Sequence, residues 1–150
     1  MIYTRLTKIA MRIAFSAHKE QVDKSGLPYI FHPFHLAEQM RDEISTCVAL
    51  LHDVLEDTST TIDDMKSQGI PETVIELLEL LTHDSSVSYM EYIQRIKDSG
   101  SQVAINVKLA DLRHNSDSSR LDTVDEKADL RLARYATAIE VLSQHVTAGE

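Results

Sequence analysis

Apolar residues recur every three or four positions along most of this chain, which is the period of an amphipathic α-helix. In residues 4–19, one helical face collects Leu6, Ile9, Ala10, Ile13, Ala14 and Ala17. The same period predicts helices at residues 4–19, 32–40, 42–55, 61–69, 71–81, 88–97, 101–115 and 125–144. No stretch of useful length alternates apolar and polar residues as a half-buried strand does. We therefore predict an all-α fold, a compact single-domain bundle of about eight helices over residues 1–150.

Local signals support several of these boundaries. Pro33 stands in the first turn of the expected second helix, where its missing N–H costs nothing. Thr61 and Asp64 have the spacing of a capping box, with Asp in place of Glu or Gln, and Gly69 ends the same helix. Residues 21–28 contain Ser-Gly and Pro and are expected to form a loop.

The composition agrees with a helical globular domain. Hydrophobic residues make up 43% of the 150 residues and charged residues 26%, both ordinary proportions. The chain has 4 Gly, 3 Pro and no Trp, and so few helix breakers favour long helices over many short strands. The length suits one domain with a sizeable core, and there is no repeat, low-complexity tract or linker.

The formal net charge of −9 limits the classes of partner. It argues against binding to nucleic acid or to an anionic membrane, because both need basic patches. A phosphorylated small molecule would have to be attracted locally, by a metal ion or a few Lys and Arg side chains. The sequence carries no signal for an oligomeric state.

The expected location is the cytoplasm. No apolar stretch approaches the ~20 residues of a membrane span. Arg5, Lys8 and Arg12 interrupt residues 1–17, which therefore lack the core of a signal peptide. The single Cys47 cannot form an internal disulfide and lies in an apolar helical run, which fits a reducing compartment.

An adjacent His-Asp pair, His52 and Asp53, interrupts the apolar run of residues 42–55. Such a pair would lie at or near the core, where an unpaired polar group costs roughly 2–7 kcal/mol and an ion far more. Glu56 and Asp57 follow four residues after His52 and Asp53, and like charges at that helical spacing repel. A divalent metal ion is the simplest cation that would hold these groups together.

Two other segments offer further ligands. His32 stands before Pro33 at a loop-to-helix boundary, and Asp111 breaks into an apolar helical run. Imidazole and carboxylate ligands together suit Mn²⁺, Fe or Zn²⁺, and the lack of a thiolate argues against a structural zinc.

Each candidate also has a simpler interpretation. His52 and Asp53 could be a buried hydrogen-bonded pair, and the acids after them a solvated helix end, although the helix dipole disfavours acids there. Lys24 could be a solvated loop lysine and Asn115 a helix C-terminal residue. The remaining histidines are interpreted mainly as structural or surface residues, with His35 the main competing ligand and His114 a support for the helix carrying Asp111: they are His18, His35, His83, His114 and His145.

The motifs together resemble one enzyme superfamily. Residues 17–21 and 24–33, residues 49–58 with their HDVLED core, and residues 108–111 with 114–115 match its motifs in order. They resemble the HD phosphohydrolases, and within them the hydrolase domain of RelA/SpoT-type alarmone enzymes and their small hydrolase-only relatives. Within these 150 residues, we expect the hydrolase domain alone and not the synthetase domain of the bifunctional enzymes.

This resemblance implies an HD-domain fold and a (p)ppGpp 3′-pyrophosphohydrolase. It implies that Mn²⁺, or another divalent transition metal, is bound by His32, His52, Asp53 and Asp111. Water would be positioned and activated by Glu56 and Asp57, and the nucleotide contacted by Lys24, Ser25 and Asn115.

The chain departs from the family pattern near the nucleotide. Asp23 stands where the family commonly has an Arg that packs on the guanine base. Leu112 and Arg113 are exchanged relative to the family, and residues 116–120 replace its Met-Arg-Thr. These changes keep two alternatives open: a phosphatase for another nucleotide, such as a 5′-nucleotide or NADPH, and a catalytically weak, metal-bound nucleotide sensor. Asp23 is expected to weaken guanine-selective binding.

Overall fold

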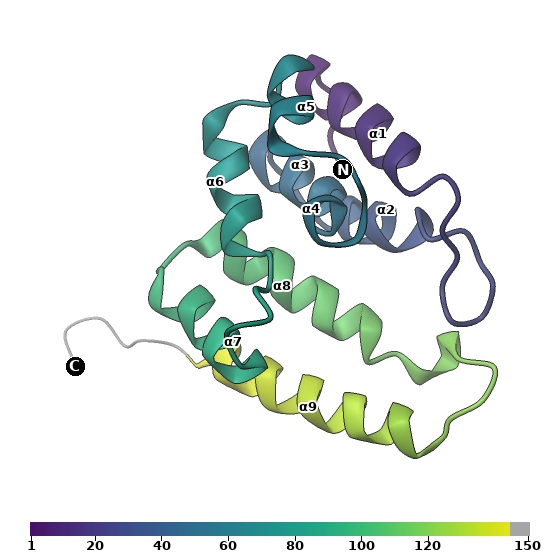
Figure 1. The fold of residues 1–150 in the computed structure, drawn as a ribbon. Helices are drawn as coiled ribbons and strands as arrows, with labels where there is room; N and C mark the ends of the chain where they lie inside the picture. Colours follow the sequence, from purple (N-terminus) through teal and green to yellow (C-terminus); the bar gives the residue numbers. More distant parts are fainter. Residues whose placement is uncertain (145–150) are drawn as a thin grey trace.

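Helices are the regular elements of the computed structural model, which describes residues 1–144 (Figure 1). Within these residues, the β-structure consists of one isolated antiparallel bridge between Val22 and Pro28. His145 lies outside the described residues. The elements are α1 Arg5–Ala17, α2 Phe31–Glu38, α3 Glu43–Leu51, α4 Val54–Asp57, α5 Ile62–Ser67, α6 Glu72–Leu80, α7 Tyr89–Asp98, α8 Gln102–Asn115, the 3₁₀ turn η1 Ser118–Arg120 and α9 Glu126–Ser143. The predicted all-α fold is confirmed.

Side-chain caps begin most of the helices. An oxygen of each cap residue accepts a hydrogen bond from a free backbone N–H in the first turn, and such caps stabilise helix starts. The predicted capping box is present, because Thr61 and Asp64 each accept from the other's backbone N–H at 3.1 and 2.9 Å. The capping residues are Thr4, Asp42, Thr61, Ser88, Ser101 and Asp125.

Two central helices, α3 and α8, organise the packing. Helix α3 packs against α1, α2, α6 and α8, and α8 also packs against α7 and α9. In Figure 1, α8 runs between an upper group of helices, α1 to α5, and a lower pair, α7 and α9. The continuous core includes the fully buried side chains Leu36, Leu50, Leu51, Ile75, Leu78, Ile93 and Leu112.

The helix expected over residues 42–55 is broken at the His-Asp pair. Helix α3 ends at Leu51 and α4 begins at Val54, so the described chain has nine α-helices where the sequence indicates about eight. The His52 ring donates from Nδ1 to the Ala49 carbonyl at 2.7 Å, and Asp53 has ψ of −2°. The ring thus occupies the carbonyl that a continuous helix would pair with the Asp53 N–H. Apolar periodicity alone cannot predict this break, because it does not show that the His52 ring competes with the Asp53 N–H for the Ala49 carbonyl.

None of the helices in residues 1–144 is both long enough and apolar enough to cross a bilayer.

The capping box provides a test of local stability. We expect Thr61→Ala to destabilise the fold by about 1 kcal/mol, because it removes the oxygen that accepts from the Asp64 N–H. For a domain of this size the midpoint of thermal unfolding should fall by about 2–4 °C. The control is Ser59→Ala, which changes an exposed residue in the preceding turn and should unfold at the wild-type temperature. Equal midpoints for both variants would contradict the assignment.

Candidate active site

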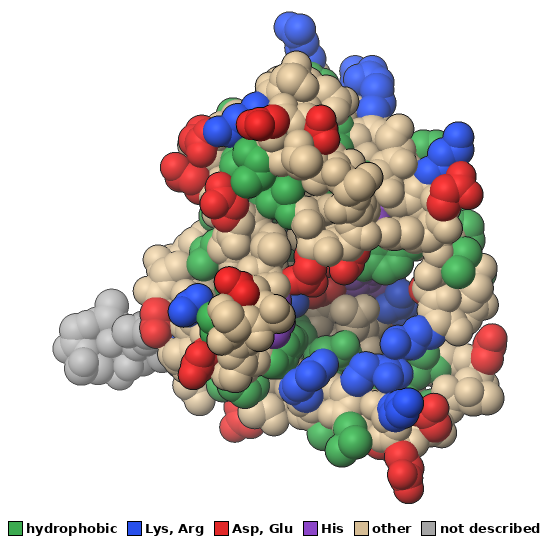
Figure 2. Space-filling model, viewed as in Figure 1, with side chains coloured by type: hydrophobic (Ala, Val, Ile, Leu, Met, Phe, Trp, Pro, Cys, Tyr) green, Lys and Arg blue, Asp and Glu red, His purple; other side chains and the backbone are tan. Residues whose placement is uncertain are grey.

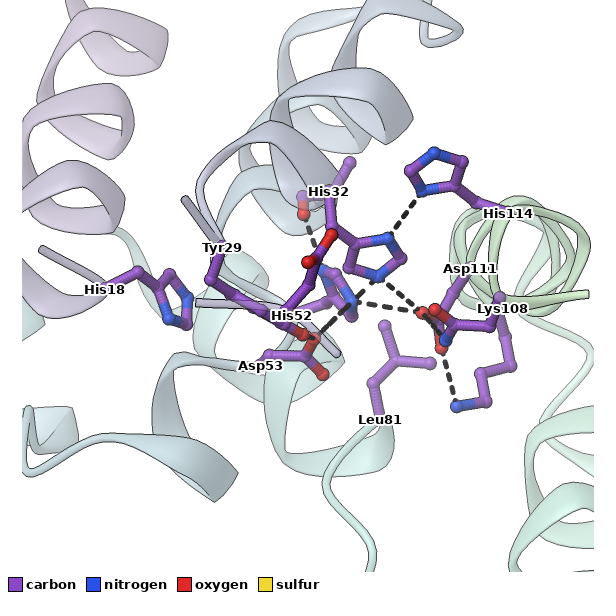
Figure 3. A network of polar contacts seen from close by, with 12 residues as sticks. His18, Tyr29, His32, His52, Asp53, Leu81, Lys108, Asp111 and His114 are labelled. Carbon is purple, nitrogen blue, oxygen red and sulfur yellow. Dashed lines mark hydrogen bonds and ion pairs between the residues drawn. The ribbon is translucent and has the colours of Figure 1, made fainter. Parts of the chain in front are cut away.

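The four predicted metal ligands converge from three parts of the fold (Figure 3). His32 comes from α2, His52 and Asp53 from the break between α3 and α4, and Asp111 from α8. One ligand atom from each lies within 4.8 Å of all the others. His32 Nε2 is 2.8 Å from Asp111 Oδ1 and 4.0 Å from Asp53 Oδ2, and His52 Nε2 is 3.4 Å from Asp111 Oδ1. A group of this kind is able to hold a metal ion.

The cluster fits a divalent metal on its own chemistry. His52 is buried, and its Nε2 atom makes no hydrogen bond although it lies 2.9 Å from Asp53 Oδ2. Burial opposes protonation of His52, yet the carboxylates of Asp53 and Asp111 raise its pKa well above the ordinary value. The two carboxylates therefore favour a positive charge at this buried nitrogen, which makes no hydrogen bond. Two imidazole nitrogens and two carboxylates suit a divalent transition ion.

Neighbouring residues hold the ligands in place. Burial alone would raise the pKa of Asp111, but the Lys108 ammonium, 2.8 Å from Asp111 Oδ2, holds that pKa well below its usual range. Asn115 donates to Asp111 Oδ1 at 3.0 Å, and the Tyr29 hydroxyl donates to Asp53 Oδ2. Such outer contacts orient ligands and tune their basicity. Tyr29 and Lys108 lie inside the matched motifs, but their spacing carries no signal for this role.

His114 is positioned to orient His32. Its Nδ1 lies 2.7 Å from His32 Nδ1, and the two ring planes are nearly parallel, 3° apart (Figure 3). Burial, followed by the charge of Arg120, lowers the pKa of His114 to about 4, so its ring is neutral at pH 7. A neutral His114 can accept from His32 Nδ1–H, which leaves the lone pair of His32 Nε2 facing the cluster. His35 stacks on the His114 ring and does not join the four ligand atoms.

Glu56 and Asp57 lie beside the ligands on α4. With Asp53 they form a second group whose ligand atoms lie within 4.8 Å of one another. Glu56 Oε1 accepts from the His83 N–H at 2.7 Å. Burial and the charges of Asp53 and Glu56 raise the pKa of Asp57 to about 6. A cation at the centre would relieve this repulsion.

A cavity of about 550 Å³ opens over the cluster and has two kinds of wall. Figure 2 shows acidic side chains along the upper edge of the central hollow and basic side chains along its lower edge. The acidic wall includes Asp53, Glu56 and Asp57, and the basic residues that line the cavity are Lys24, Lys108, Arg120, Arg131 and Arg134. The sequence provides no reason to select Arg131 and Arg134, because the pattern of α9 indicates only an amphipathic helix.

The three predicted nucleotide contacts differ in position. Lys24 and Asn115 line the cavity. Ser25 does not, and its hydroxyl donates to the Arg120 carbonyl at 2.6 Å. The structure therefore gives Ser25 a partner in the protein, between the loop of residues 21–28 and η1.

Comparison with known proteins finds relatives whose names describe alarmone hydrolases. No family model matches the chain. It is 40% identical over 84 residues to guanosine-3′,5′-bis(diphosphate) 3′-pyrophosphohydrolase of Aquifex aeolicus, covering 53% of this chain and 12% of the relative. It is 37% identical over 125 residues to the bifunctional (p)ppGpp synthase/hydrolase SpoT of Escherichia coli K12, covering 71% and 17%. The predicted resemblance is confirmed.

Shorter relatives match over more of their length. The chain is 34% identical over 114 residues to guanosine-3′,5′-bis(diphosphate) 3′-pyrophosphohydrolase MESH1 of Mus musculus, covering 67% of this chain and 63% of that protein. A solved structure described as a metazoan ortholog of SpoT that hydrolyzes ppGpp superposes with a TM-score of 0.76 at 23% identity, over 95% of this chain and 88% of that one. This similarity supports the HD-domain fold. The chain spans less than a fifth of the first two relatives.

His114 provides a test of how the ligands are oriented. We expect His114→Leu to weaken divalent metal binding by about 10–100-fold, because His32 Nδ1–H loses its acceptor. The measurement is calorimetric titration of metal into chelator-treated protein. The control is His35→Leu, which changes the exposed neighbour that stacks on His114 and should bind metal like wild type. Equal losses in the two variants would mean that ring stacking, and not the hydrogen bond to His32, supports the site.

Proposed function

We propose that this chain is a divalent-metal-dependent nucleotide phosphohydrolase, with (p)ppGpp as substrate, its 3′-pyrophosphate as the group removed and Mn²⁺ as the ion. The observation that carries this proposal is the convergence of His32, His52, Asp53 and Asp111 beneath a cavity whose wall holds two further acids. The names of the similar proteins point to the same substrate. A cytoplasmic location is part of the proposal and rests on the buried free thiol of Cys47.

The side chains have distinct roles in this reaction. The two imidazole Nε2 atoms and the carboxylates of Asp53 and Asp111 would hold the ion. A bound divalent ion lowers the pKa of water and polarises a phosphoryl oxygen. Asp57, whose carboxylate lies beside Asp53 and Glu56 at the cavity wall, is placed to accept a proton from the attacking water. Glu56, fixed by the His83 N–H, would orient that water.

The opposite wall suits the phosphates of the substrate. Arg131 and Arg134 both line the cavity, and neither forms an ion pair within residues 1–144. Lys24 adds a third cation from the loop of residues 21–28. Because the chain carries a net charge of −9, an anionic ligand is attracted only where such cations gather. We expect Lys24 and Asn115 to contact the nucleotide directly and Ser25 to act through Arg120.

Two alternatives are tested by the same panel of substrates. Asp23 favours retaining a phosphatase for another nucleotide, such as a 5′-nucleotide or NADPH. A metal-bound sensor without turnover is disfavoured by the presence of Glu56 and Asp57, which a pure binder does not need. Purified protein with Mn²⁺ should release pyrophosphate from ppGpp faster than it releases phosphate from NADPH or nucleoside monophosphates. The reverse order would replace ppGpp as the substrate, and no turnover of any nucleotide would favour the sensor.

Removing one acid next to the ligands should separate metal binding from turnover. We expect Glu56→Ala to retain metal and to lose about 10²–10⁴-fold in kcat, because water loses its orienting carboxylate while the four ligands remain. Asp57→Ala should behave similarly. Glu76→Ala, an exposed acid on α6 outside the cavity, is the matched control and should keep the wild-type rate. Near-wild-type turnover in both α4 variants would refute these roles.

A further inference from the structure

Part of the cavity wall is formed by contacts between two segments far apart in the sequence. The loop that carries Asp23 and Ser25 meets η1, which ends at Arg120. Ser25 Oγ donates to the Arg120 carbonyl at 2.6 Å, and Asp23 Oδ2 lies 3.9 Å from Arg120 Nη2. Asp23 and Arg120 both line the cavity, with 17% and 23% of their side chains exposed. A ligand in the cavity can therefore reach the pair, and the hydrogen bond from Ser25 fixes the backbone at Arg120.

Both partners of this pair are fixed by other contacts. Arg120 Nη1 donates to the His114 carbonyl at 2.8 Å and approaches Asn115 Oδ1 at 3.4 Å. Asp23 Oδ1 accepts from the N–H groups of Ser25 and Leu27 at 2.9 and 3.0 Å, which turns Oδ2 toward the guanidinium. A guanidinium held along its edge in this way keeps its flat face free for stacking.

Arg120 has a carboxylate partner among the described residues, and the two arginines of α9 that line the cavity do not. Arg120 faces Asp23, whereas Arg131 and Arg134 form no ion pair within residues 1–144. A phosphate is therefore favoured on α9, where the positive charge is not offset. At Arg120 the positive charge is offset by Asp23. The flat guanidinium therefore favours stacking on a neutral aromatic ring. The apolar side chains that line the cavity beside this pair are Val22 and Leu121.

We propose that Arg120 stacks on the base of the bound nucleotide and that Asp23 is a positioning residue which holds the guanidinium for that contact. This inference rests on the proposed function and adds to it that the substrate is recognised by its base as well as by its pyrophosphate. It also changes the expectation for position 23. Replacing Asp23 by Arg would set one guanidinium against another, so Asp23→Arg should weaken nucleotide binding.

Equilibrium binding to two probes tests the stacking contact. The protein carries Glu56→Ala to prevent turnover and is loaded with Mn²⁺, and the probes are ppGpp and inorganic pyrophosphate. We expect Arg120→Gln to weaken ppGpp binding roughly tenfold and to leave pyrophosphate binding unchanged. Arg120→Lys should not restore ppGpp binding, because an ammonium keeps the charge but lacks the flat face. The control is Arg113→Gln, an exposed arginine in the last turn of α8 that lines a separate hollow.

The outcomes separate this inference from the proposed function. Equal losses for ppGpp and pyrophosphate would show a phosphate contact and overturn the base assignment. Unchanged ppGpp binding in both Arg120 variants, with a parent that binds normally, would overturn the inference alone. A parent that binds pyrophosphate but no nucleotide would overturn the proposed function together with it. Thermal unfolding of each variant identifies a folding defect, in which case the Lys variant, closest to Arg in length and charge, decides.

The role of Asp23 is tested by steady-state kinetics with Glu56 intact. Asp23→Asn keeps an oxygen for the Ser25 and Leu27 N–H groups and removes only the charge facing Arg120. We expect KM for ppGpp to rise several-fold with kcat unchanged. A fall in kcat with constant KM would place Asp23 in the chemical step and contradict a positioning role.

Discussion

Much of the structure depends on the burial of one carboxylate, that of Asp111. An ion in a protein interior costs several kcal/mol unless it is paired and hydrogen-bonded. Asp111 meets this demand through Lys108 at 2.8 Å and Asn115 at 3.0 Å, and its Oδ1 lies 2.8 Å from His32 Nε2, the atom with which it would share a cation. Lys108 and Asn115 share α8 with Asp111, but His32 lies on α2. The carboxylate therefore constrains how closely α2 and α8 pack.

The break between α3 and α4 follows from the same constraint. A continuous helix would carry His52 and Asp53 past the centre at successive positions about 100° apart. Ending α3 at Leu51 lets the His52 ring bond to the Ala49 carbonyl while its Nε2 atom and the Asp53 carboxylate both face Asp111. The local loss of one backbone hydrogen bond is compensated by a side-chain bond at 2.7 Å. Two adjacent residues can then serve one centre.

The sequence predicts the features that local rules determine. Helix faces, the Thr61 capping box and the grouping of the four candidate ligands follow from periodicity, cap chemistry and motif spacing, although the metal itself stays a prediction. The break after Leu51 does not, because Val54 and Leu55 continue the apolar pattern. The contact between Asp23 and Arg120 could not be predicted from the sequence either, because only the tertiary fold brings these two residues together. For the same reason, the sequence alone indicates that Asp23 removes a contact to the base, whereas the structure shows that Asp23 faces Arg120.

The proposed metal ligands and the pair Asp23 and Arg120 differ in how deeply they are buried. The proposed metal ligands His32, His52 and Asp111, beneath the cavity, are almost wholly buried, and their environment tolerates little change in volume or charge. Asp23 and Arg120 are partly exposed and stand on a loop and a 3₁₀ turn. Substitutions there disturb few core contacts and act mainly on what the cavity accepts. The fold thus allows substrate selection to change while the arrangement that would perform hydrolysis is kept.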